Sequence, residues 1–477
     1  MTEAYIRAAE VIPSKRQLEW QKTEMYAFCH FGMNTFTDKE WGDGTDSPAL
    51  FNPTDFDADQ WARVIKNGGL NGIILTCKHH DGFCLWPSKY TDYSVKASPF
   101  KDGSGDIVRE VSNACKKHGL KFGVYLSPWD RHEKTYGEGK AYDTYFVNQL
   151  TELLTDYGDI FCVWFDGACG EGKNGRIQQY DWPGYYKVIR ELMPDAVISI
   201  CGPDVRWIGN ETAVCRESEW SVVPSRLAIN EYTAEHSQKS VDEKIRDRYK
   251  MELDLGSRKA IKNEKELIWY PAEVDVSVRP GWFYHKSEDY RVKSYDKLVE
   301  IYLNSVGGNA NLLLNIPPDK TGRIHEIDAL ALDSFARSLR DMFYNKVSEG
   351  SKVKASSELD ELHRASNILS DNGILYWQCA ADDKEPEIVI DFGEEKSFDS
   401  VVLKENIATG QQIESFALFI NKKGKWKRLC KGTVIGYKKI VRLKKKVSSD
   451  KLRIKITSYR VKAALEKVEI CASREYI

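Results

Sequence analysis

The feature that most constrains the fold of this chain is an alternation, between residues 22 and 340, of short apolar runs with stretches of helical period. A parallel strand that helices cover on both faces reads as an unbroken apolar run, so this alternation indicates βα units. Eight strands are expected, the sixth on the weakest signal: Tyr26–Phe31, Gly72–Thr76, Lys121–Leu126, Ile160–Phe165, Val197–Cys201, Val214–Glu217, Ile268–Ala272 and Asn311–Ile316. The expected helices include Ala58–Asn67, Asp106–His118, Thr144–Tyr157 and Tyr185–Met193. This pattern predicts an α/β fold of the (β/α)8, TIM-like barrel type.

Several of the expected strands end in a burst of polar and aromatic residues. These segments read LTCKHHDG, YLSPWD, VWFDGA and GPDVRW, after the second to the fifth strand. In (β/α)8 enzymes the chemistry lies at the carboxyl ends of the strands. Ordinary polar loop starts are the alternative, but so many aromatic, His and carboxylate residues at equivalent positions favour a functional site.

The pattern changes near residue 345. Lys-rich segments with period-2 alternation follow, at Glu387–Phe392, Ser400–Glu405, Phe416–Ile420 and Lys451–Ile456. This alternation predicts an antiparallel, all-β sandwich. We interpret residues 345–357 as a linker, and we divide the chain into a barrel domain at residues 1–345 and a sandwich domain at residues 346–477.

Charge and cysteine content exclude several classes of function. The 69 basic and 71 acidic residues give a formal net charge of -2, which provides no drive toward nucleic acid. The 11 cysteines show neither CxxC spacing nor a Cys/His cluster, so we expect mostly buried free thiols and no structural zinc. No run of 18 apolar residues occurs, and no membrane span is expected.

The N-terminus lacks the apolar core of a signal peptide, so a soluble protein is expected. A signal peptide replaced by Met1 would leave the same sequence. We therefore expect a periplasmic or secreted location if a signal peptide has been removed, and a cytoplasmic one otherwise. Nothing in the sequence indicates an oligomeric state.

The strongest local signal is FCVWFDGA, where an apolar strand places one carboxylate, Asp166, at its tip. A carboxylate held there can attack an anomeric carbon, because glycosidases flank the scissile bond with two carboxyl groups. A helix cap for the following segment is the alternative role of Asp166.

The adjacent His79 and His80 also stand at a strand end, where one ring can face a pocket while the other braces it. Imidazoles can donate to or accept from sugar hydroxyls. The pair is a poor metal site, because neighbouring strand residues point to opposite faces and no third ligand is evident. His30 ends the first strand, and Glu40 and Trp41 in the next loop add a carboxylate and an aromatic face.

Six blocks together resemble the α-L-fucosidases of glycoside hydrolase family 29. They are CHFGMNTF, KEWGDG, KHHDGFCLWPS, VWFDGA, GPDVRWIGNE and AEVDVSVRPGWFYH, and the resemblance covers residues 10–345. It implies a barrel-like catalytic domain, retention of configuration, no required cofactor and release of terminal L-fucose. It also implies that Asp166 is the nucleophile and that the following residues contact fucose: His30, Glu40, Trp41, His79, His80, Tyr125 and Trp164.

The acid/base residue is placed differently in subgroups of that family. Here GPDVRWIGNE followed by RESEWSVVP resembles the subgroup that acts on α-1,3/1,4-linked fucose, which makes Glu211 our first choice. Glu273 is the more distant alternative, and Glu217 and Glu219 are nearby ones. A glutamate that is not chosen would contact a hydroxyl or form an ion pair, with Arg206 among the partners.

Four further residues are considered as contacts of the substrate. The C6 methyl group of fucose needs an apolar wall, for which Trp220, Trp282 and Phe283 are candidates; core packing is the alternative role for each. Arg206 is also counted among the substrate-binding residues. The expected partner is a fucosylated oligosaccharide or glycoconjugate. A glycosidase of related sugar specificity and a non-catalytic glycan-binding protein are the competing hypotheses, and the presence of Asp166 argues against the second.

The C-terminal segment resembles the galactose-binding-like sandwiches of the coagulation factor 5/8 type. The resemblance rests on KASSELDELHRASNILSDNG, EIVIDFGEEKSFDSVVL and the closing strand LRIKI. Because such domains sometimes hold Ca²⁺ through turn aspartates, a structural Ca²⁺ is a further prediction. We expect the domain to pack against the barrel more than to bind glycan.

Overall fold

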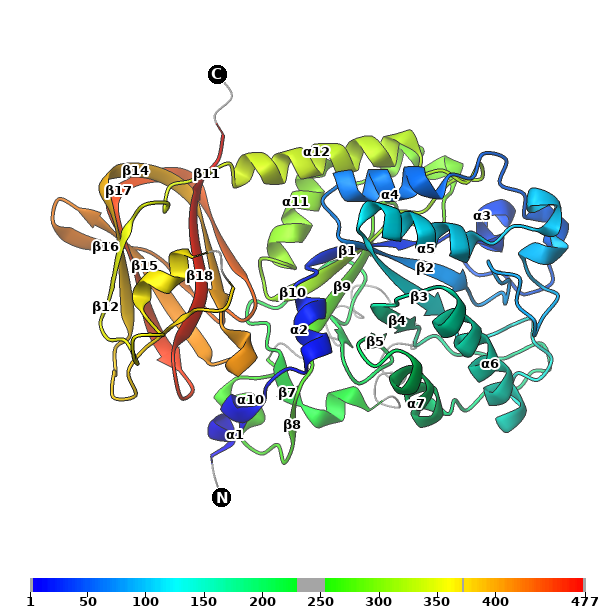
Figure 1. Cartoon of the computed structure of the whole chain (residues 1–477), viewed down its shortest axis with the longest axis horizontal. Coiled ribbons are helices and arrows are strands. Elements are labelled where there is room, and N and C mark those ends of the chain that lie inside the picture. The colour runs from blue at the N-terminus through cyan, green and yellow to red at the C-terminus, as the bar shows by residue number, and fades with distance from the viewer. Residues whose placement is uncertain (1–2, 230–253, 371–372, 475–477) are drawn as a thin grey trace.

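The computed structural model describes residues 3–229, 254–370 and 373–474. Figure 1 shows a helix-covered barrel beside a β-sandwich, with helix α12 (Glu326–Met342) leading from one to the other. This arrangement confirms the expected fold class, a (β/α)8-type barrel followed by an all-β domain.

The barrel sheet contains eight parallel strands in the order β5-β4-β3-β2-β1-β10-β9-β6. A parallel bridge between Ser199 and Val205 links β5 to β6 and nearly closes the sheet. Almost every strand residue is buried, as expected for strands covered on both faces. The strands are β1 (Met25–Cys29), β2 (Gly72–Lys78), β3 (Lys121–Leu126), β4 (Cys162–Phe165), β5 (Val197–Ile200), β6 (Arg206–Trp207), β9 (Ala272–Ser277) and β10 (Ala310–Asn315).

The helices that cover this sheet begin at defined caps. Asp57, Asp106 and Asp181 each accept a backbone N–H from the first turn of the helix that follows. Residues 201–205, between β5 and β6, contain no helix. The covering helices are α4 (Ala58–Asn67), α5 (Ile107–His118), α6 (Lys140–Asp156), α7 (Trp182–Leu192), α11 (Tyr295–Asn304) and α12.

Two of the expected strands are wrong in position. Residues 214–217 form no strand, and Val214 is exposed; the two-residue β6 takes the sixth place in the barrel. The run expected at 268–272 is divided at Pro271. Because proline has no N–H to donate to a ladder, the chain forms β8 (Leu267–Trp269) before it and β9 after it. Only β9 belongs to the barrel, since β8 pairs antiparallel with β7 (Val222–Pro224) in a separate sheet.

The C-terminal domain is a single antiparallel sheet folded by its two longest strands, β14 and β17. The pairing of β14 with β17 shifts in register twice, just before Lys396 and just before Ser400 of β14. These irregularities let both strands contribute to both layers of the sandwich. Residues 345–357, interpreted above as a linker, instead supply two strands of this sheet. Its strands are β11 (Asn345–Lys346), β12 (Lys352–Ala355), β13 (Trp377–Gln378), β14 (Glu387–Glu405), β15 (Ile413–Lys422), β16 (Lys425–Gly432), β17 (Lys439–Tyr459) and β18 (Ala464–Ala472).

The two domains are joined by packed side chains as well as by the chain itself. Ile440 of β17 packs into the barrel core, and its N–H donates to Gly307 O at 2.9 Å. A smaller apolar cluster combines Trp220 with Val434 of the sandwich domain. The other described α-helices of this part of the chain are short: α1 (Ala4–Glu10), α2 (Lys15–Gln21), α3 (Met33–Thr37) and α10 (Arg258–Ile261).

Three further observations concern the described residues as a whole. No helix there is both long and apolar enough to cross a bilayer. All 11 cysteines have free thiols, and eight of them are buried. Within the same residues no group of three or more His, Cys, Asp or Glu side chains could hold a metal ion, and the structural Ca²⁺ stays a prediction.

Candidate active site

Asp166 lies at the carboxyl end of β4, in the mouth of the barrel, with its side chain 27% exposed. Both carboxylate oxygens are held. Oδ1 accepts the N–H of Ala168 at 2.8 Å, and Oδ2 accepts the hydroxyl of Tyr125 at 3.1 Å. Asp166 is not a helix cap, because no helix begins between Asp166 and Trp182 and the helix at Trp182 is capped by Asp181. The carboxylate is therefore fixed in position and still reachable from solvent.

His80 faces the same carboxylate from the end of β2. Its Nε2 lies 3.7 Å from Oδ2 of Asp166, and its Nδ1 lies 2.7 Å from Oγ of Ser127. Because the Ser127 hydroxyl donates its only proton to Trp129 O, Nδ1 of His80 must be the donor in that contact. Burial lowers the pKa of His80, assisted by the Arg131 charge and opposed by Asp166.

His30 is held by an amide network at the end of β1. Its Nδ1 lies 2.8 Å from Oδ1 of Asn315, whose Nδ2 donates to Ser277 Oγ and to Trp282 O. Burial lowers the pKa of His30 to about 3, so the ring is neutral. Since Nδ1 donates to the amide oxygen, Nε2 is left as an acceptor for a hydroxyl.

His79 stands between His30 and His80. Its ring stacks on Tyr125 at a centroid distance of 5.7 Å, and Nδ1 lies 3.4 Å from Nδ2 of Asn34. Burial and the neighbouring imidazoles lower its pKa well below the ordinary value. The three imidazoles are therefore neutral together and can exchange hydrogen bonds with hydroxyl groups.

Aromatic rings form the walls of the mouth. Trp164 stacks on Tyr125 with ring centroids 5.3 Å apart, and Trp282 lies 5.1 Å from the ring of His30. Trp41 is 57% exposed and meets the rings of His80 and Trp129 edge-on. Flat apolar faces beside imidazole and carboxylate groups suit a sugar ring, which has both C–H faces and hydroxyls.

Glu40 connects two loops of the mouth. Its carboxylate accepts the N–H of Trp282 at 2.8 Å and of Phe283 at 3.1 Å. His285 bridges Glu40 and Asp38, with one ring nitrogen 2.7 Å from each carboxylate. Glu40, predicted as a substrate ligand, therefore anchors the loop that carries Trp282.

Glu211 lies on an exposed loop directly after β6. Gly209, with a φ of 106°, turns the chain, and Oδ1 of Asn210 accepts the N–H groups of Thr212 and Val214. Trp282 Nε1 donates to Oε2 of Glu211 at 3.4 Å. This contact brings the first-choice acid/base to the same mouth as the imidazoles.

Glu273, the alternative acid/base, lies deep inside the barrel. It is fully buried and accepts hydrogen bonds from Tyr26, from Trp164 Nε1 at 2.7 Å and from Ser199 at 3.1 Å. Burial raises its pKa to about 6, against the effect of these donors. Such a carboxylate supports Trp164 from below and has no surface for a leaving group.

Arg206 and Trp220 are corrections to the predicted substrate contacts. The Arg206 guanidinium forms a buried ion pair with Glu219 and donates to Trp220 O at 3.0 Å. Trp220 is 3% exposed, and its ring lies under the guanidinium of Arg460. Since Trp207 on the short β6 faces Asp275 inside the barrel, alternation turns Arg206 to the opposite side. Trp220 packs against Val434 of the sandwich.

Sequence reasoning missed several residues that shape the site. Trp129 packs on His80, His285 clamps the Glu40 loop, and Asp275 lies on β9 two residues beyond Glu273. Asp275 and His285 both stand in the block AEVDVSVRPGWFYH, so that block contained the signal. What it could not indicate is which of its polar residues face the barrel interior.

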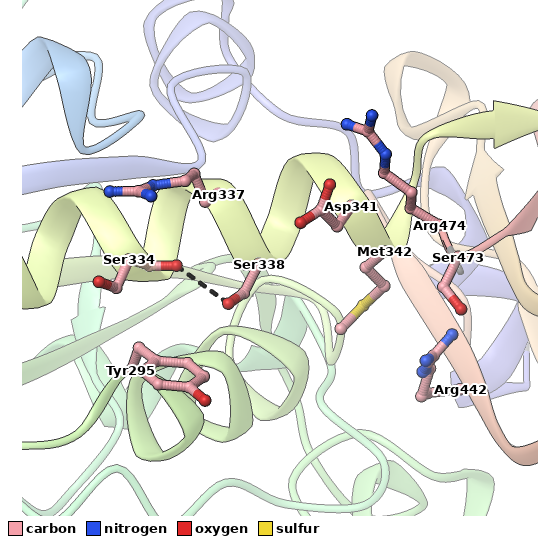
Figure 2. Close-up of a pocket in the computed structure, with 9 residues that line it drawn as sticks. All are labelled: Tyr295, Ser334, Arg337, Ser338, Asp341, Met342, Arg442, Ser473 and Arg474. Carbon is pink, nitrogen blue, oxygen red and sulfur yellow. Dashed lines mark hydrogen bonds between the residues drawn. The ribbon is translucent and has the colours of Figure 1, made fainter. Parts of the chain in front are cut away.

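A separate cavity of about 490 Å³ lies where α12 meets the sandwich. Figure 2 shows Tyr295, Asp341, Arg442 and Arg474 around it, with Ser338 donating to Ser334 O. Arg442 pairs with Asp399 at 2.6 Å. None of the predicted site residues lines this cavity.

The fixed carboxylate, neutral imidazoles and aromatic walls at the mouth of a parallel barrel suit the chemistry of a glycoside hydrolase. The family model for alpha-L-fucosidase matches residues 6–341, and that for the F5/8 type C domain matches residues 352–470. The chain therefore belongs to the alpha-L-fucosidase family, glycoside hydrolase family 29, as the sequence blocks predicted.

Relatives from plants and bacteria resemble the whole chain. Alpha-L-fucosidase 1 of Arabidopsis thaliana is 40% identical over 456 residues, which cover 94% of this chain and 85% of that one. A Bacteroides ovatus protein classed with these enzymes is 44% identical, with a TM-score of 0.84, over 98% of this chain and 75% of that one. The GH29 fucosidase of Ruminococcus gnavus in complex with fucose is 31% identical, with a TM-score of 0.84, over 98% and 96%.

Proposed function

We propose that this enzyme is a retaining exo-α-L-fucosidase that releases terminal α-1,3/1,4-linked L-fucose from oligosaccharides or glycoconjugates. The observation that carries the proposal is the placement of Asp166, whose two oxygens are fixed by Ala168 and Tyr125 within reach of His80. The fucose bound by the R. gnavus relative supports the choice of sugar.

Two displacements complete the reaction. In the first, a carboxylate oxygen of Asp166 attacks the anomeric carbon while Glu211 gives its proton to the departing glycosidic oxygen. In the second, the Glu211 carboxylate takes a proton from water, the water oxygen attacks the anomeric carbon, and the bond to Asp166 breaks. Two inversions at one carbon give net retention.

The two carboxyl groups need different environments, and the structure supports this difference. Asp166 accepts two hydrogen bonds, which hold its carboxylate in place for attack on the anomeric carbon. Glu211 lies on an exposed loop beside the indole of Trp282, where a leaving sugar can reach it. His30 offers Nε2 as an acceptor for a sugar hydroxyl, since Asn315 holds its other nitrogen.

The linkage preference is proposed from the segment RESEWSVVP and what it does in the fold. Arg216 donates to Ile208 O at 3.3 Å and to Glu219 at 3.2 Å, so this segment braces the loop that carries Glu211. Exposed Trp41 supplies a flat face for the sugar next to fucose. A fixed loop and an exposed indole suit a branched substrate, whose remaining sugars extend from the mouth in two directions.

The test is fucose release from a Lewis-type trisaccharide by the wild type and by Asp166→Ala, Glu211→Ala and Glu273→Ala. Azide rescue of each variant is measured on a dinitrophenyl fucoside, whose leaving group needs no proton. The proposal expects rescue of Asp166→Ala as the β-azide and of Glu211→Ala as the α-azide, because azide replaces the nucleophile in one and the second-step water in the other. A fully active Asp166→Ala would refute the site.

Substrate panels test the remaining part of the proposal. Release from 2′-linked linear fucosides, with none from branched ones, would refute the linkage preference. Faster hydrolysis of a nitrophenyl α-L-galactoside than of the matching fucoside would favour the related specificity instead.

A further inference from the structure

Asp275 is a third carboxyl group of the barrel, and the mechanism above leaves it without a role. It follows Glu273 by two residues on β9, so its side chain points to the same interior side, one layer nearer the mouth. The side chain is 4% exposed. Trp207 Nε1 donates to Oδ1 at 2.6 Å, which fixes the carboxyl group and leaves Oδ2 to carry a proton.

The loop with Glu211 is anchored to the same strand. Ile208 N donates to Glu273 O at 2.9 Å, which ties the end of β6 to β9 just before the loop turns at Gly209. Trp207, on β6, contacts Asp275, and Glu211 follows Trp207 by four residues. Glu211 thus starts from the part of β6 that contacts Asp275, and its charge acts on Asp275.

The charges around Asp275 are few. Glu211 exerts the largest charge effect on it and Glu273, one layer below, a smaller one. On the neighbouring strands, the partner in register on β10 is the uncharged Leu313, and the guanidinium of Arg206 is engaged by Glu219. The titratable groups elsewhere around the mouth include Asp166 with Tyr125, Glu40 with His285, and the three imidazoles, which their burial keeps neutral.

Together these groups favour the protonated form of Asp275. Burial, with the charges of Glu211 and Glu273, raises the pKa of Asp275 well above its ordinary value, although the hydrogen bond from Trp207 acts in the opposite direction. A carboxylic acid that stays neutral at pH 7 can donate a hydrogen bond to a developing negative charge.

We propose that Asp275 is a positioning residue that acts through Glu211: its buried carboxylic acid donates a hydrogen bond to the carboxylate that Glu211 becomes on giving up its proton. The inference rests on the proposed role of Glu211 as acid/base. The glycosidic oxygen receives the proton of Glu211, and Asp275 keeps its own throughout. The conjugate base is thus stabilised in the first step and is placed to take a proton from water in the second.

The test compares Asp275→Asn with Asp275→Leu. The asparagine amide can accept from Trp207 and donate to Glu211, as the neutral acid does, whereas leucine fills the volume without a donor. On a trisaccharide, whose leaving group needs a proton, Asp275→Leu should lower kcat/KM by about ten- to a hundredfold, the range for a hydrogen bond to a charged group. Asp275→Asn should lose far less.

The pH profile of kcat/KM separates the proposed role from a packing defect, because a packing defect would not shift the pH at which kcat/KM falls. Loss of the donor makes the Glu211 carboxylate less stable, so its pKa rises. The alkaline limb of kcat/KM should therefore move to higher pH by about one to two units in Asp275→Leu and stay near the wild-type position in Asp275→Asn. With a dinitrophenyl fucoside, which leaves without a proton, the rate of Asp275→Leu should approach that of the wild type.

Several outcomes would overturn the inference. If Asp275→Leu folds and keeps the wild-type pH profile and the wild-type rate on trisaccharide, the enzyme does not need the hydrogen bond from Asp275. An Asp275→Asn enzyme as inactive on trisaccharide as Glu211→Ala would make Asp275 the acid itself. The proposed function fails separately, when the wild type releases no fucose or azide does not rescue Glu211→Ala.

Discussion

The hydroxyl of Tyr125 donates a hydrogen bond of 3.1 Å to Oδ2 of Asp166 from the neighbouring strand of the barrel. We predict that Tyr125→Phe lowers kcat/KM on nitrophenyl fucoside by about ten- to a hundredfold, because a hydrogen bond to a charged group contributes about 1.5–3 kcal/mol. Tyr157→Phe is the matched control, since that phenol donates to Asp106 at 3.0 Å outside the mouth. Equal rates for both variants would contradict the prediction.

Glu273 should be important for stability more than for proton transfer. Glu273→Ala leaves the donors of Tyr26, Trp164 and Ser199 without a partner inside the barrel, and we expect it to lower the free energy of unfolding by about 3 kcal/mol. Urea titration measures this loss, and Glu211→Ala on its exposed loop should change stability by no more than about 0.5 kcal/mol. Azide rescue of Glu273→Ala would instead make Glu273 the acid/base.

The clamp formed by His285 should depend on pH. Burial lowers the pKa of His285, but its hydrogen bonds to Asp38 and Glu40 outweigh burial and leave the pKa raised. A raised pKa means that the clamp is fully present below the ordinary histidine value of about 6.5 and is lost as the pH rises through the higher folded value. We predict faster hydrogen exchange of the Trp282 and Phe283 amides above that pH.

A control variant makes this pH dependence specific. In His285→Gln, which cannot be charged, the protection of the two amides should show no step over the same pH range once the intrinsic exchange rate is divided out. A step of the same size in the variant would assign the change to another group.

Arg460 should join the two domains energetically. Its buried guanidinium donates to Gly256 O at 2.7 Å and to Ala8 O at 3.4 Å, and it covers the ring of Trp220 at 4.3 Å. Arg460→Met keeps most of the volume and removes these donors. We expect a loss of about 3 kcal/mol in the free energy of unfolding, measured by denaturant titration, while exposed Arg474→Met stays within about 0.5 kcal/mol. A stability equal to wild type would show that the junction tolerates the change.

Most barrel elements could be predicted because their signals are local. The expected helix Ala58–Asn67 has the observed bounds, and the strand Lys121–Leu126 does too. The sixth strand could not be found, since two residues, Arg206 and Trp207, carry no periodicity. The seventh was displaced by Pro271, whose missing N–H divides one apolar run between two sheets.

The candidate site divides in a similar way. Residues at strand ends, such as Asp166 and His80, could be anticipated because parallel strands bring their carboxyl ends to one mouth. Side chains whose role depends on direction could not. Trp220 and Trp282 look alike in sequence, yet one is sealed under Arg460 and the other contacts Glu211.

The sequence by itself determined the order of strands and helices, the family and the residues brought to the barrel mouth, because periodicity and linear motifs act over a few neighbouring residues. Only the tertiary structure decided the roles of three carboxyl groups, Glu40, Glu273 and Asp275. One became a loop anchor, one a buried support for Trp164 and one a neighbour of Glu211. The reason is physical: burial and partners from distant strands set the charge state and the contacts of each carboxyl group, and neither can be read from its neighbours in the chain.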